Sequence, residues 1–352
     1  MDISVLLMAG GRGTRFWPMS REQRPKQLLH LFHDESMISQ TVRRLEPMVA
    51  TADVLVITSH TIENAVREDL HWLPPENIIG EPKGCNTAPC VALGALICQA
   101  RYGPDHVMTV LPADHYIGDQ EGYLRTLERA AGVAAEGYIT TVGIQPTHPE
   151  TGYGYLECGA DLPQVAGAFE LNAFVEKPDA AKAFEYLTQG RHLWNSGMFF
   201  FRVDTILEEF KKNLPEVLEC FENAMKKENA SQVEDALEAA YESMPSISID
   251  YGIMEKCRKI AAVRGDFLWS DIGSWRALLD LREDNNSSFL QGNIISKDCS
   301  DSVLIADEGI TLATLGVEGL AVVACKDITL VVPLERAQEV RMLADQFQTR
   351  NK

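Results

Sequence analysis

The stretch ISVLLMAGGRGTRFWPMSREQRPK, residues 3–26, joins an apolar run to a glycine-rich, basic segment. Residues 3–8 are apolar almost without interruption, which predicts a strand buried on both faces of a sheet. Glycines follow at positions 10, 11 and 13, and glycines let the backbone come close to a phosphate and point its N–H groups at it. Open α/β sheets bind ligands at the carboxyl ends of their strands. The stretch therefore predicts an anion site where the first strand ends.

The glycine-rich segment carries the opposite charge to the chain as a whole. The 352 residues include 32 Lys and Arg and 51 Asp and Glu, a formal net charge of −19. From Arg12 to Lys26, five basic residues and one acidic residue, Glu22, give a net charge of +4. A local reversal of this size indicates a polyanionic ligand. The acidic chain as a whole argues against a non-specific nucleic-acid binder and against docking on an anionic membrane.

The pattern of apolar runs predicts an α/β fold. Buried strands are expected at residues 3–8, 53–58, 106–111 and 138–144, with helices at 36–49, 60–73, 87–102 and 120–136. Such alternation favours a parallel sheet with helices on both faces. Further strands are expected at 153–157, 169–175 and 198–202, and helices over 204–244, 250–259 and 272–282.

A polar run, EDNNSS at residues 283–288, is the best candidate for a domain boundary. It divides the chain into a main domain, residues 1–284, and a small β-rich domain, residues 285–352. Beyond the run, short β-type segments recur at 302–306, 320–324 and 328–332, and a helix is expected at 335–348. A domain of this size has little core of its own and should pack on another surface.

Cysteine and histidine spacing argues against a zinc site and a CxxC motif. The eight cysteines contain no CxxC pair, and the eight histidines form no HxxxH pattern. No apolar run reaches the about 18 residues of a membrane span, and the apolar start is too short for a signal-peptide core. We therefore expect a cytoplasmic protein with reduced thiols.

The motif GGRGTRFWPMSREQRPKQ, residues 10–27, closely resembles the signature of sugar-1-phosphate nucleotidyltransferases. Within it, FWP, SR and PKQ resemble the mannose-1-phosphate guanylyltransferases in particular. The resemblance implies a Rossmann-like, mixed but mostly parallel sheet of the nucleotide-diphospho-sugar transferase type, with a small C-terminal left-handed β-helix-like domain that can help the chain form a homodimer. It implies GTP and mannose 1-phosphate as substrates and Mg²⁺ as cofactor.

The resemblance also assigns site residues. Arg15 and Lys26 are expected to be catalytic. The expected nucleotide-binding residues are Gly10, Gly11, Gly13, Thr14, Arg15, Glu81, Asn86, Thr87, Ala88 and Asp114.

The segment EPKGCNTAP, residues 81–89, resembles the family's base-binding segment. A carboxylate such as Glu81 can accept hydrogen bonds from both N1–H and the 2-amino group of guanine, which adenine and uracil do not offer together. Asn86 and Thr87 fit two compatible readings, a helix cap and a ligand contact. The family usually has Arg where this chain has Cys85, so one positive contact is missing here or supplied elsewhere.

Two carboxylates match the positions at which the family holds Mg²⁺. Asp114, in LPADH, ends a predicted buried strand, and Asp271 lies in WSDIGSW. One or two carboxylates with phosphate oxygens and water suit this small hard cation. The alternative interpretations are a turn residue at Asp114 and a helix cap at Asp271.

Three further motifs, TGYGY, FVEKP and WNSGMF, follow in the family's order and imply a sugar-phosphate site. Its expected residues are Tyr153, Gly154, Glu176, Lys177 and Asn195. Without the resemblance, EKP is typical of a turn at a strand end, and WNSG of a loop. DYGIMEK, residues 250–256, also matches the family, and we interpret it as packing and capping beneath the site.

Three other functions remain open from the sequence. The same chemistry can serve another nucleoside triphosphate or another hexose or heptose 1-phosphate. A non-catalytic homologue that senses nucleotide sugars is disfavoured, because Arg15, Lys26, Asp114 and Asp271 are all present. A Rossmann dehydrogenase is disfavoured because GxGxxG does not follow the first strand.

Overall fold

The computed structural model describes residues 2–11, 13–226, 230–281 and 288–350. Backbone contacts divide the chain into two compact units. Unit 1 comprises residues 1–10, 41–113 and 117–269, and unit 2 comprises residues 11–40, 114–116 and 270–352. The glycine-rich segment thus belongs to the same unit as the C-terminal strands. The predicted boundary between residues 284 and 285, and the predicted cation Arg12, lie outside the described residues.

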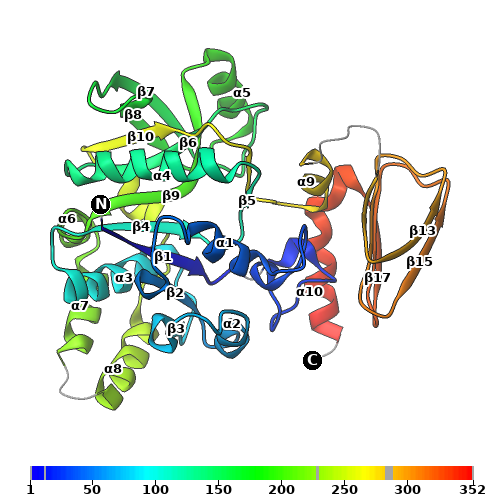
Figure 1. The fold of residues 1–352 in the computed structure, drawn as a ribbon, viewed down its shortest axis with the longest axis horizontal. Coiled ribbons are helices and arrows are strands. Elements are labelled where there is room, and N and C mark those ends of the chain that lie inside the picture. Colours follow the sequence, from blue (N-terminus) through cyan, green and yellow to red (C-terminus); the bar gives the residue numbers. More distant parts are fainter. Residues whose placement is uncertain (1, 12, 227–229, 282–287, 351–352) are drawn as a thin grey trace. The chain divides into compact units, whose positions relative to one another are not determined.

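Unit 1 contains a nine-stranded sheet in the order β3-β2-β1-β4-β9-β6-β10-β8-β7 (Figure 1). Its strands are β1 (Ile3–Ala9), β2 (Val54–Ser59), β3 (Ile78–Glu81), β4 (Val107–Pro112), β6 (Ile139–Ile144), β7 (Tyr155–Asp161), β8 (Ala168–Val175), β9 (His192–Arg202) and β10 (Ile260–Arg264). Only β8 and β9 run opposite to the others, as their antiparallel pairings with β10, β4 and β6 require. The sheet is therefore mixed but mostly parallel, as predicted.

The buried strands have the sequences expected of them. All of β1 except Met8 is buried, and β2 and β4 are buried along nearly their whole lengths. A strand covered on both faces needs apolar side chains on both, and this explains the unbroken apolar runs. Pairings of β1 with β2 and with β4 place the carboxyl ends of these strands at one edge of the sheet.

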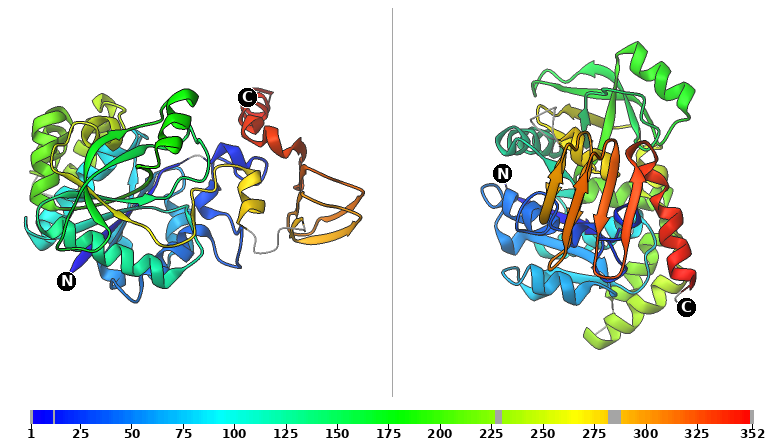
Figure 2. Two further views of the ribbon diagram at one scale, coloured as in Figure 1. Left: turned by 90° about the horizontal axis from the view of Figure 1, so that it is seen from above. Right: turned by 90° about the vertical axis from the view of Figure 1, so that its right-hand side faces the viewer.

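Helices cover this sheet (Figure 2). They are α2 (Glu63–Asp69), α3 (Thr87–Tyr102), α4 (Gln120–Ala135), α5 (Ala180–Gln189), α6 (Val203–Asn213), α7 (Pro215–Met225) and α8 (Ala230–Ser243). Helix α3 shares a core with α6, α7 and strand side chains such as Leu6 and Met108. Helix α4 instead packs against β6, β9 and β10.

Two of the next three segments differ from the sequence-based expectations. The predicted helix at 250–259 is a single π-helical turn, Asp250–Met254. The mostly helical region predicted over 204–244 contains α6, α7 and α8, and the interruption expected at Pro215 is present, since Pro215 starts α7 and cannot continue α6. WNSG lies inside β9 rather than in a loop, because its small polar residues form a β-bulge against β6, where the pairing register shifts.

Unit 2 is built on short strands that alternate between two sheets. One sheet contains β12 (Phe289–Gln291), β14 (Val303–Ala306), β16 (Leu320–Ala324) and β17 (Thr329–Pro333), and the other contains β13 (Asn293–Lys297) and β15 (Thr311–Leu315). All pairs are parallel except β16 with β17. Successive strands therefore stack in coils, as in a β-helix.

The core of unit 2 joins these strands to the glycine-rich segment. Phe16, Ile272 and Trp275 share one apolar cluster with Val303 and Val323. Helices α9 (Trp275–Asp280) and α10 (Val340–Arg350) and the 3-10 turn Leu334–Glu339 complete the unit. The short strands β5 (Tyr116–Ile117) and β11 (Trp269–Ser270) and the helix α1 (Met37–Leu45) lie where the chain passes from one unit to the other.

Candidate active site

The glycine-rich segment forms a tight turn that requires glycine at position 13. Gly13 has a φ of 56°, and a Cβ atom there would lie 2.6 Å from the Cβ of Lys26. Its carbonyl accepts hydrogen bonds from the Phe16 N–H (3.0 Å) and the Ser20 hydroxyl (2.7 Å). The turn thereby brings Lys26 against the glycines.

Lys26 is a buried cation that connects three segments of unit 2. Its side chain is 7% exposed, and its Nζ lies 3.0 Å from Asp114 Oδ2. The same Nζ donates to the backbone carbonyl of Asp271 and lies 5.9 Å from the centre of the Phe16 ring. Burial raises the pKa of Asp114, but the neighbouring Lys26 and His115, together with hydrogen bonds to the carboxylate, outweigh burial and hold that pKa below its usual value. The carboxylate is therefore ionised at neutral pH.

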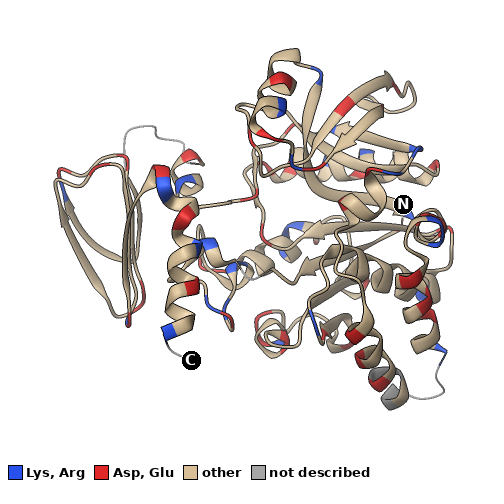
Figure 3. Ribbon diagram, turned by 180° about the vertical axis from the view of Figure 1, so that it is seen from behind, with Lys and Arg blue, Asp and Glu red and all other residues tan. Residues whose placement is uncertain are grey.

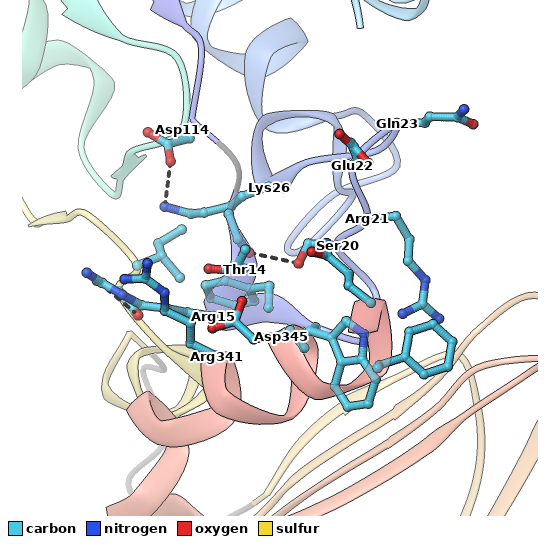
Figure 4. Close-up of a pocket in the computed structure, with 18 of the residues that line it drawn as sticks. Thr14, Arg15, Ser20, Arg21, Glu22, Gln23, Lys26, Asp114, Arg341 and Asp345 are labelled. Atoms are coloured by element: carbon cyan, nitrogen blue, oxygen red, sulfur yellow. Dashed lines mark hydrogen bonds and ion pairs between the residues drawn. The ribbon is translucent and has the colours of Figure 1, made fainter. Parts of the chain in front are cut away.

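These residues line a cavity of about 910 Å³ within unit 2 (Figure 4). Gly13, Thr14, Arg15, Lys26, Asp114 and Asp271, all predicted site residues, are among its lining. Arg15 donates to the Gly273 carbonyl at 3.4 Å. In total the lining holds four cations, Arg15, Arg21, Lys26 and Arg341, and four carboxylates, Glu22, Asp114, Asp271 and Asp345. Such a lining suits an anionic ligand that arrives with a cation.

The predicted base-binding segment lies in unit 1, at the end of β3. Glu81 is buried, and its Oε1 accepts a hydrogen bond from the Tyr241 hydroxyl at 2.9 Å. Burial raises the pKa of Glu81 to about 7, although the Tyr241 hydrogen bond opposes the rise. A Cβ atom on Gly10 would lie 3.8 Å from the other oxygen, Oε2. Tyr241 thus fixes one carboxylate oxygen, while the other, Oε2, lies near Gly10 of the same unit.

The residues that follow Glu81 start helix α3. Asn86 caps the helix, because its side chain accepts from the Thr87 N–H at 2.9 Å. The Thr87 hydroxyl accepts from the Ile249 N–H at 2.8 Å, and the Ala88 N–H donates to the Ile247 carbonyl at 3.1 Å. These three residues therefore have structural roles, and a ligand contact stays a prediction for them.

Cys85 stands where the family usually has arginine, and its side chain is fully buried. Its Sγ lies 3.9 Å from the Tyr241 carbonyl, and burial raises the pKa of the thiol. This position therefore offers a ligand no positive charge.

Two of the predicted sugar-site residues of unit 1, Asn195 and Glu176, are held in place by hydrogen bonds. Asn195 Oδ1 accepts from the Thr141 hydroxyl (3.0 Å) and the Gly197 N–H (3.1 Å), and Asn195 Nδ2 donates to Asp250 Oδ1 (3.2 Å). The Glu176 N–H donates to Glu255 Oε1 at 2.9 Å. Both ends of the Asn195 amide are thereby oriented.

Glu176 interacts electrostatically with two charged neighbours. Its carboxylate forms an ion pair with Lys177, and it repels the nearby carboxylate of Asp250. Burial first, and then this repulsion, raise the pKa of Asp250 to about 6. Tyr153 packs edge-on between Trp194 and Trp269, with ring centres 5.2 and 5.3 Å apart. Gly154, Glu176 and Asn195 therefore lie close together, and Asp250 contacts Asn195.

Asp250, Glu255 and Tyr241 belong to these networks, although sequence reasoning did not assign them to a site. DYGIMEK predicts only packing and capping, whereas Asp250 contacts Asn195 directly. The signal that could have identified Asp250 was the resemblance of DYGIMEK to the family, because that motif begins with this aspartate. Nothing in the sequence of α8 distinguishes Tyr241.

Gly154 has no room for a side chain, which gives a prediction for the sugar site. A Cβ atom there would lie 2.7 Å from Glu176 Oε2 and 3.2 Å from Asn195 Cβ. We expect Gly154→Ala to displace these side chains and to raise KM for the sugar phosphate about tenfold or more, with KM for the nucleotide unchanged. Steady-state kinetics checks this.

The matched control is Gly132→Ala in α4, where a Cβ atom meets nothing within 4 Å. If Gly154→Ala had wild-type kinetics, the assignment of Glu176 and Asn195 to the sugar site would be wrong.

The described residues contain no group of three or more His, Cys, Asp or Glu side chains placed to hold a metal ion. They also contain no helix with the length and apolar character that crossing a membrane requires. Acidic side chains are spread over both units rather than gathered in one patch (Figure 3).

Comparisons with known proteins place this geometry in a family. The model for the nucleotidyl transferase family matches residues 4–288, and the model for the mannose-phosphate isomerase/GMP-like β-helix domain matches residues 292–347. A mannose-1-phosphate guanylyltransferase from Klebsiella pneumoniae is 40% identical over 344 residues, 96% of this chain and 72% of that protein. The xanthan biosynthesis protein XanB from Xanthomonas campestris pv. campestris is 38% identical over 351 residues, 99% of this chain and 74% of that protein.

A solved structure agrees with these relatives. The crystal structure of a Thermus thermophilus protein, described as a mannose-1-phosphate geranyltransferase, superposes with a TM-score of 0.90 at 37% identity. It covers 99% of this chain and 100% of the other. The chain therefore belongs to the nucleotidyl transferase family and groups there with relatives named mannose-1-phosphate guanylyltransferase.

Proposed function

We propose that this protein transfers the guanylyl group of GTP to α-D-mannose 1-phosphate, giving GDP-mannose and pyrophosphate. The observation that supports this most strongly is the unit 2 cavity, in which Arg15 and Lys26 lie with the carboxylates Asp114 and Asp271. Cations for phosphate oxygens and carboxylates for a metal ion are the groups that phosphoryl-type transfer needs.

The reaction needs no general base. An oxygen of the sugar phosphate attacks the α-phosphorus of GTP in line and forms the new P–O bond. The bond from that phosphorus to the bridging oxygen breaks, and pyrophosphate leaves with the electron pair. The nucleophile is already anionic at neutral pH, since the second pKa of a phosphate monoester is about 6. The protein's task is to bring two polyanions together and to neutralise them.

Lys26 and Arg15 are suited to that task. The Lys26 ammonium is held by Asp114 and the Asp271 carbonyl, so it is fixed before the substrate arrives. Arg15 offers a planar fork of N–H donors, of which one meets the Gly273 carbonyl. Both would neutralise the α-phosphate and the departing pyrophosphate, with little reorganisation during the reaction.

The residues of the cavity fit Mg²⁺. This ion is usually bound by one or two protein carboxylates, with substrate phosphates and water as its other ligands. Asp114 is ionised beside Lys26, and Asp271 lines the same cavity. In this proposal Asp114 and Asp271 would hold the ion, which when bound would offset the charge on the phosphate oxygens.

Unit 1 offers separate groups for the base and for the hexose. The Glu81 carboxylate can accept from guanine N1–H and the 2-amino group, and Tyr241 already occupies one side of Oε1. Glu176, Asn195 and Asp250 offer oriented acceptors and donors for sugar hydroxyls.

A matrix of substrates tests the proposal. Pyrophosphate release would be measured for four nucleoside triphosphates against mannose, glucose and heptose 1-phosphates, with Mg²⁺ and with a chelator. We expect the highest kcat/KM for GTP with mannose 1-phosphate and loss of activity with the chelator. If another nucleotide and sugar phosphate gave the highest kcat/KM, they would replace GTP and mannose 1-phosphate in the proposal, and the reaction type would stay the same. If no pair released pyrophosphate, the result would support a nucleotide-sugar sensor instead.

We also propose a homodimer formed through the C-terminal strands. Ile295 of β13 and Leu315 of β15 are 64% and 72% exposed, although both are apolar. Sedimentation analysis would give the mass of two chains, and a single-chain mass at micromolar concentration would contradict this.

A further inference from the structure

The C-terminal helix α10 lines the same cavity as Lys26 and Asp114. Arg341, Ala344, Asp345 and Gln348 are among the lining residues, and their spacing places them on one face of the helix. The nucleotidyl transferase model ends at residue 288, so this face lies outside the part of the chain that it matches.

Specific contacts hold α10 against the glycine-rich segment. The ring centres of Phe347 and Trp17 are 5.8 Å apart, and the Arg21 guanidinium lies 5.7 Å from the centre of the Phe347 ring. Helix α10 also packs on the 3-10 turn Thr14–Phe16, which carries Arg15. Ala344 is buried and Val340 belongs to the apolar core of unit 2. The helix is thus a built part of the cavity wall.

Arg341 extends from α10 toward the loop that carries Thr14 and Arg15 (Figure 4). Among the described residues it has neither a hydrogen-bond nor an ion-pair partner. Asp345 lies four residues later, at a spacing where opposite charges commonly pair, yet no ion pair joins the two in the described part of the chain. Arg341 is exposed, so the N–H donors of its guanidinium are available to an anionic ligand.

The charges that line the cavity also favour a phosphate ligand for Arg341. Among the described residues, four cations and four carboxylates line the cavity, and two of those carboxylates are the proposed metal ligands. Arg21 is already paired with Asp327 at 2.9 Å, and Lys26 with Asp114. Of the guanidinium groups in the described lining, Arg15 and Arg341 are therefore the two without an ion pair to a carboxylate.

We propose that Arg341 binds the polyphosphate of the nucleotide, and the pyrophosphate formed from it, so that the C-terminal helix is part of the active site. This inference rests on the proposed function. It assigns to the β-helix-type domain a direct role in substrate binding, in addition to any role in assembly. A guanidinium is suited to it because its N–H groups form paired, charge-assisted hydrogen bonds with phosphate oxygens.

The test uses Arg341→Gln in the intact protein, with Arg341→Lys as a charge-keeping variant. Arg350→Gln is the matched control, since Arg350 is an exposed arginine of the same helix that does not line the cavity. Binding of magnesium pyrophosphate would be measured by titration calorimetry, and KM for GTP and for mannose 1-phosphate by steady-state kinetics.

We expect Arg341→Gln to weaken pyrophosphate binding and to raise KM for GTP, each about ten- to a hundred-fold, because a charge-assisted hydrogen bond is lost. KM for mannose 1-phosphate and the melting temperature should stay at wild-type values, Arg341→Lys should recover part of the loss, and Arg350→Gln should match the wild type. Wild-type pyrophosphate affinity in Arg341→Gln would overturn the inference. The titration needs no turnover, so a wild type that binds pyrophosphate but makes no product would overturn the proposed function alone.

Discussion

Replacing Lys26 by alanine is expected to lower kcat by about 10²–10³-fold, because one preorganised cation is removed from the site of developing charge. Lys26 is the only lysine among the described residues that line the unit 2 cavity, and its ammonium is fixed 3.0 Å from Asp114. No water molecule can replace a buried positive charge at this position. Single-turnover and steady-state kinetics with GTP and mannose 1-phosphate measure the effect.

The same substitution should leave the fold intact. Asp114 loses its ion pair, but its side chain is 34% exposed, so water can solvate the unpaired carboxylate. Lys211→Ala, at an exposed position of α6, is the control for loss of one lysine charge. A Lys26→Ala variant that melts like the wild type and retains wild-type kcat would refute the catalytic assignment.

Replacing Glu81 by glutamine is expected to weaken guanine recognition and, at the same time, to stabilise the protein above neutral pH. The carboxylate can accept from two guanine N–H groups, whereas the amide presents only one acceptor oxygen. KM for GTP should rise about tenfold or more. The preference for GTP over ITP, which lacks the 2-amino group, should shrink, and steady-state kinetics with both nucleotides measures it.

The stability effect follows from the buried carboxylate. Burial raises the pKa of Glu81 from 4.5 to about 7. Below pH 4.5 the group is neutral in both the folded and the unfolded chain. Between pH 4.5 and about pH 7, Glu81 ionises in the unfolded chain more readily than in the folded chain, so the wild type loses stability as the pH rises. Above about pH 7 the full free-energy cost of burying the ionised carboxylate is present. Glutamine does not titrate, so the variant should be more stable at about pH 8 by at most about 3 kcal/mol.

Urea unfolding at several pH values checks this. The difference between Glu81→Gln and the wild type should vanish near pH 4 and grow toward pH 8. Glu76→Gln, at an exposed site shortly before β3, should show no such trend. A pH-independent difference would mean that Glu81 is not a buried titrating carboxyl group.

The helices and strands that could be predicted are those indicated by residues close together in the sequence. Strand β1 and helix α3 up to Cys98 are largely buried, so their apolar runs are nearly unbroken and their positions can be read directly. The composition of WNSG predicts a loop, but the segment forms a β-bulge, which uses the same small polar residues as a turn. The apolar residues after Asp250 have helical spacing and so predict a longer helix than the single turn that the structure contains.

Site residues could be predicted where they belong to a sequence motif. They could not be predicted where the contact is formed only by tertiary packing. Lys26, Asp114 and Asp271 are far apart in the sequence; the resemblance assigned all three to one site, and the structure places them in the lining of one cavity. Tyr241 reaches Glu81 from a helix about 160 residues away in sequence, and no local pattern indicates such a contact. Arg341 was predicted to lie on a helix, but its position in the cavity depends on the packing of Phe347 against Trp17.

Titration calorimetry of GTP into the intact protein with magnesium tests most directly the claim that the unit 2 cavity binds a nucleoside triphosphate. We predict saturable binding at one site per chain, at least about tenfold tighter than that of guanosine and largely lost in Lys26→Ala. Affinity for GTP no greater than for guanosine, or unchanged in Lys26→Ala, would contradict it.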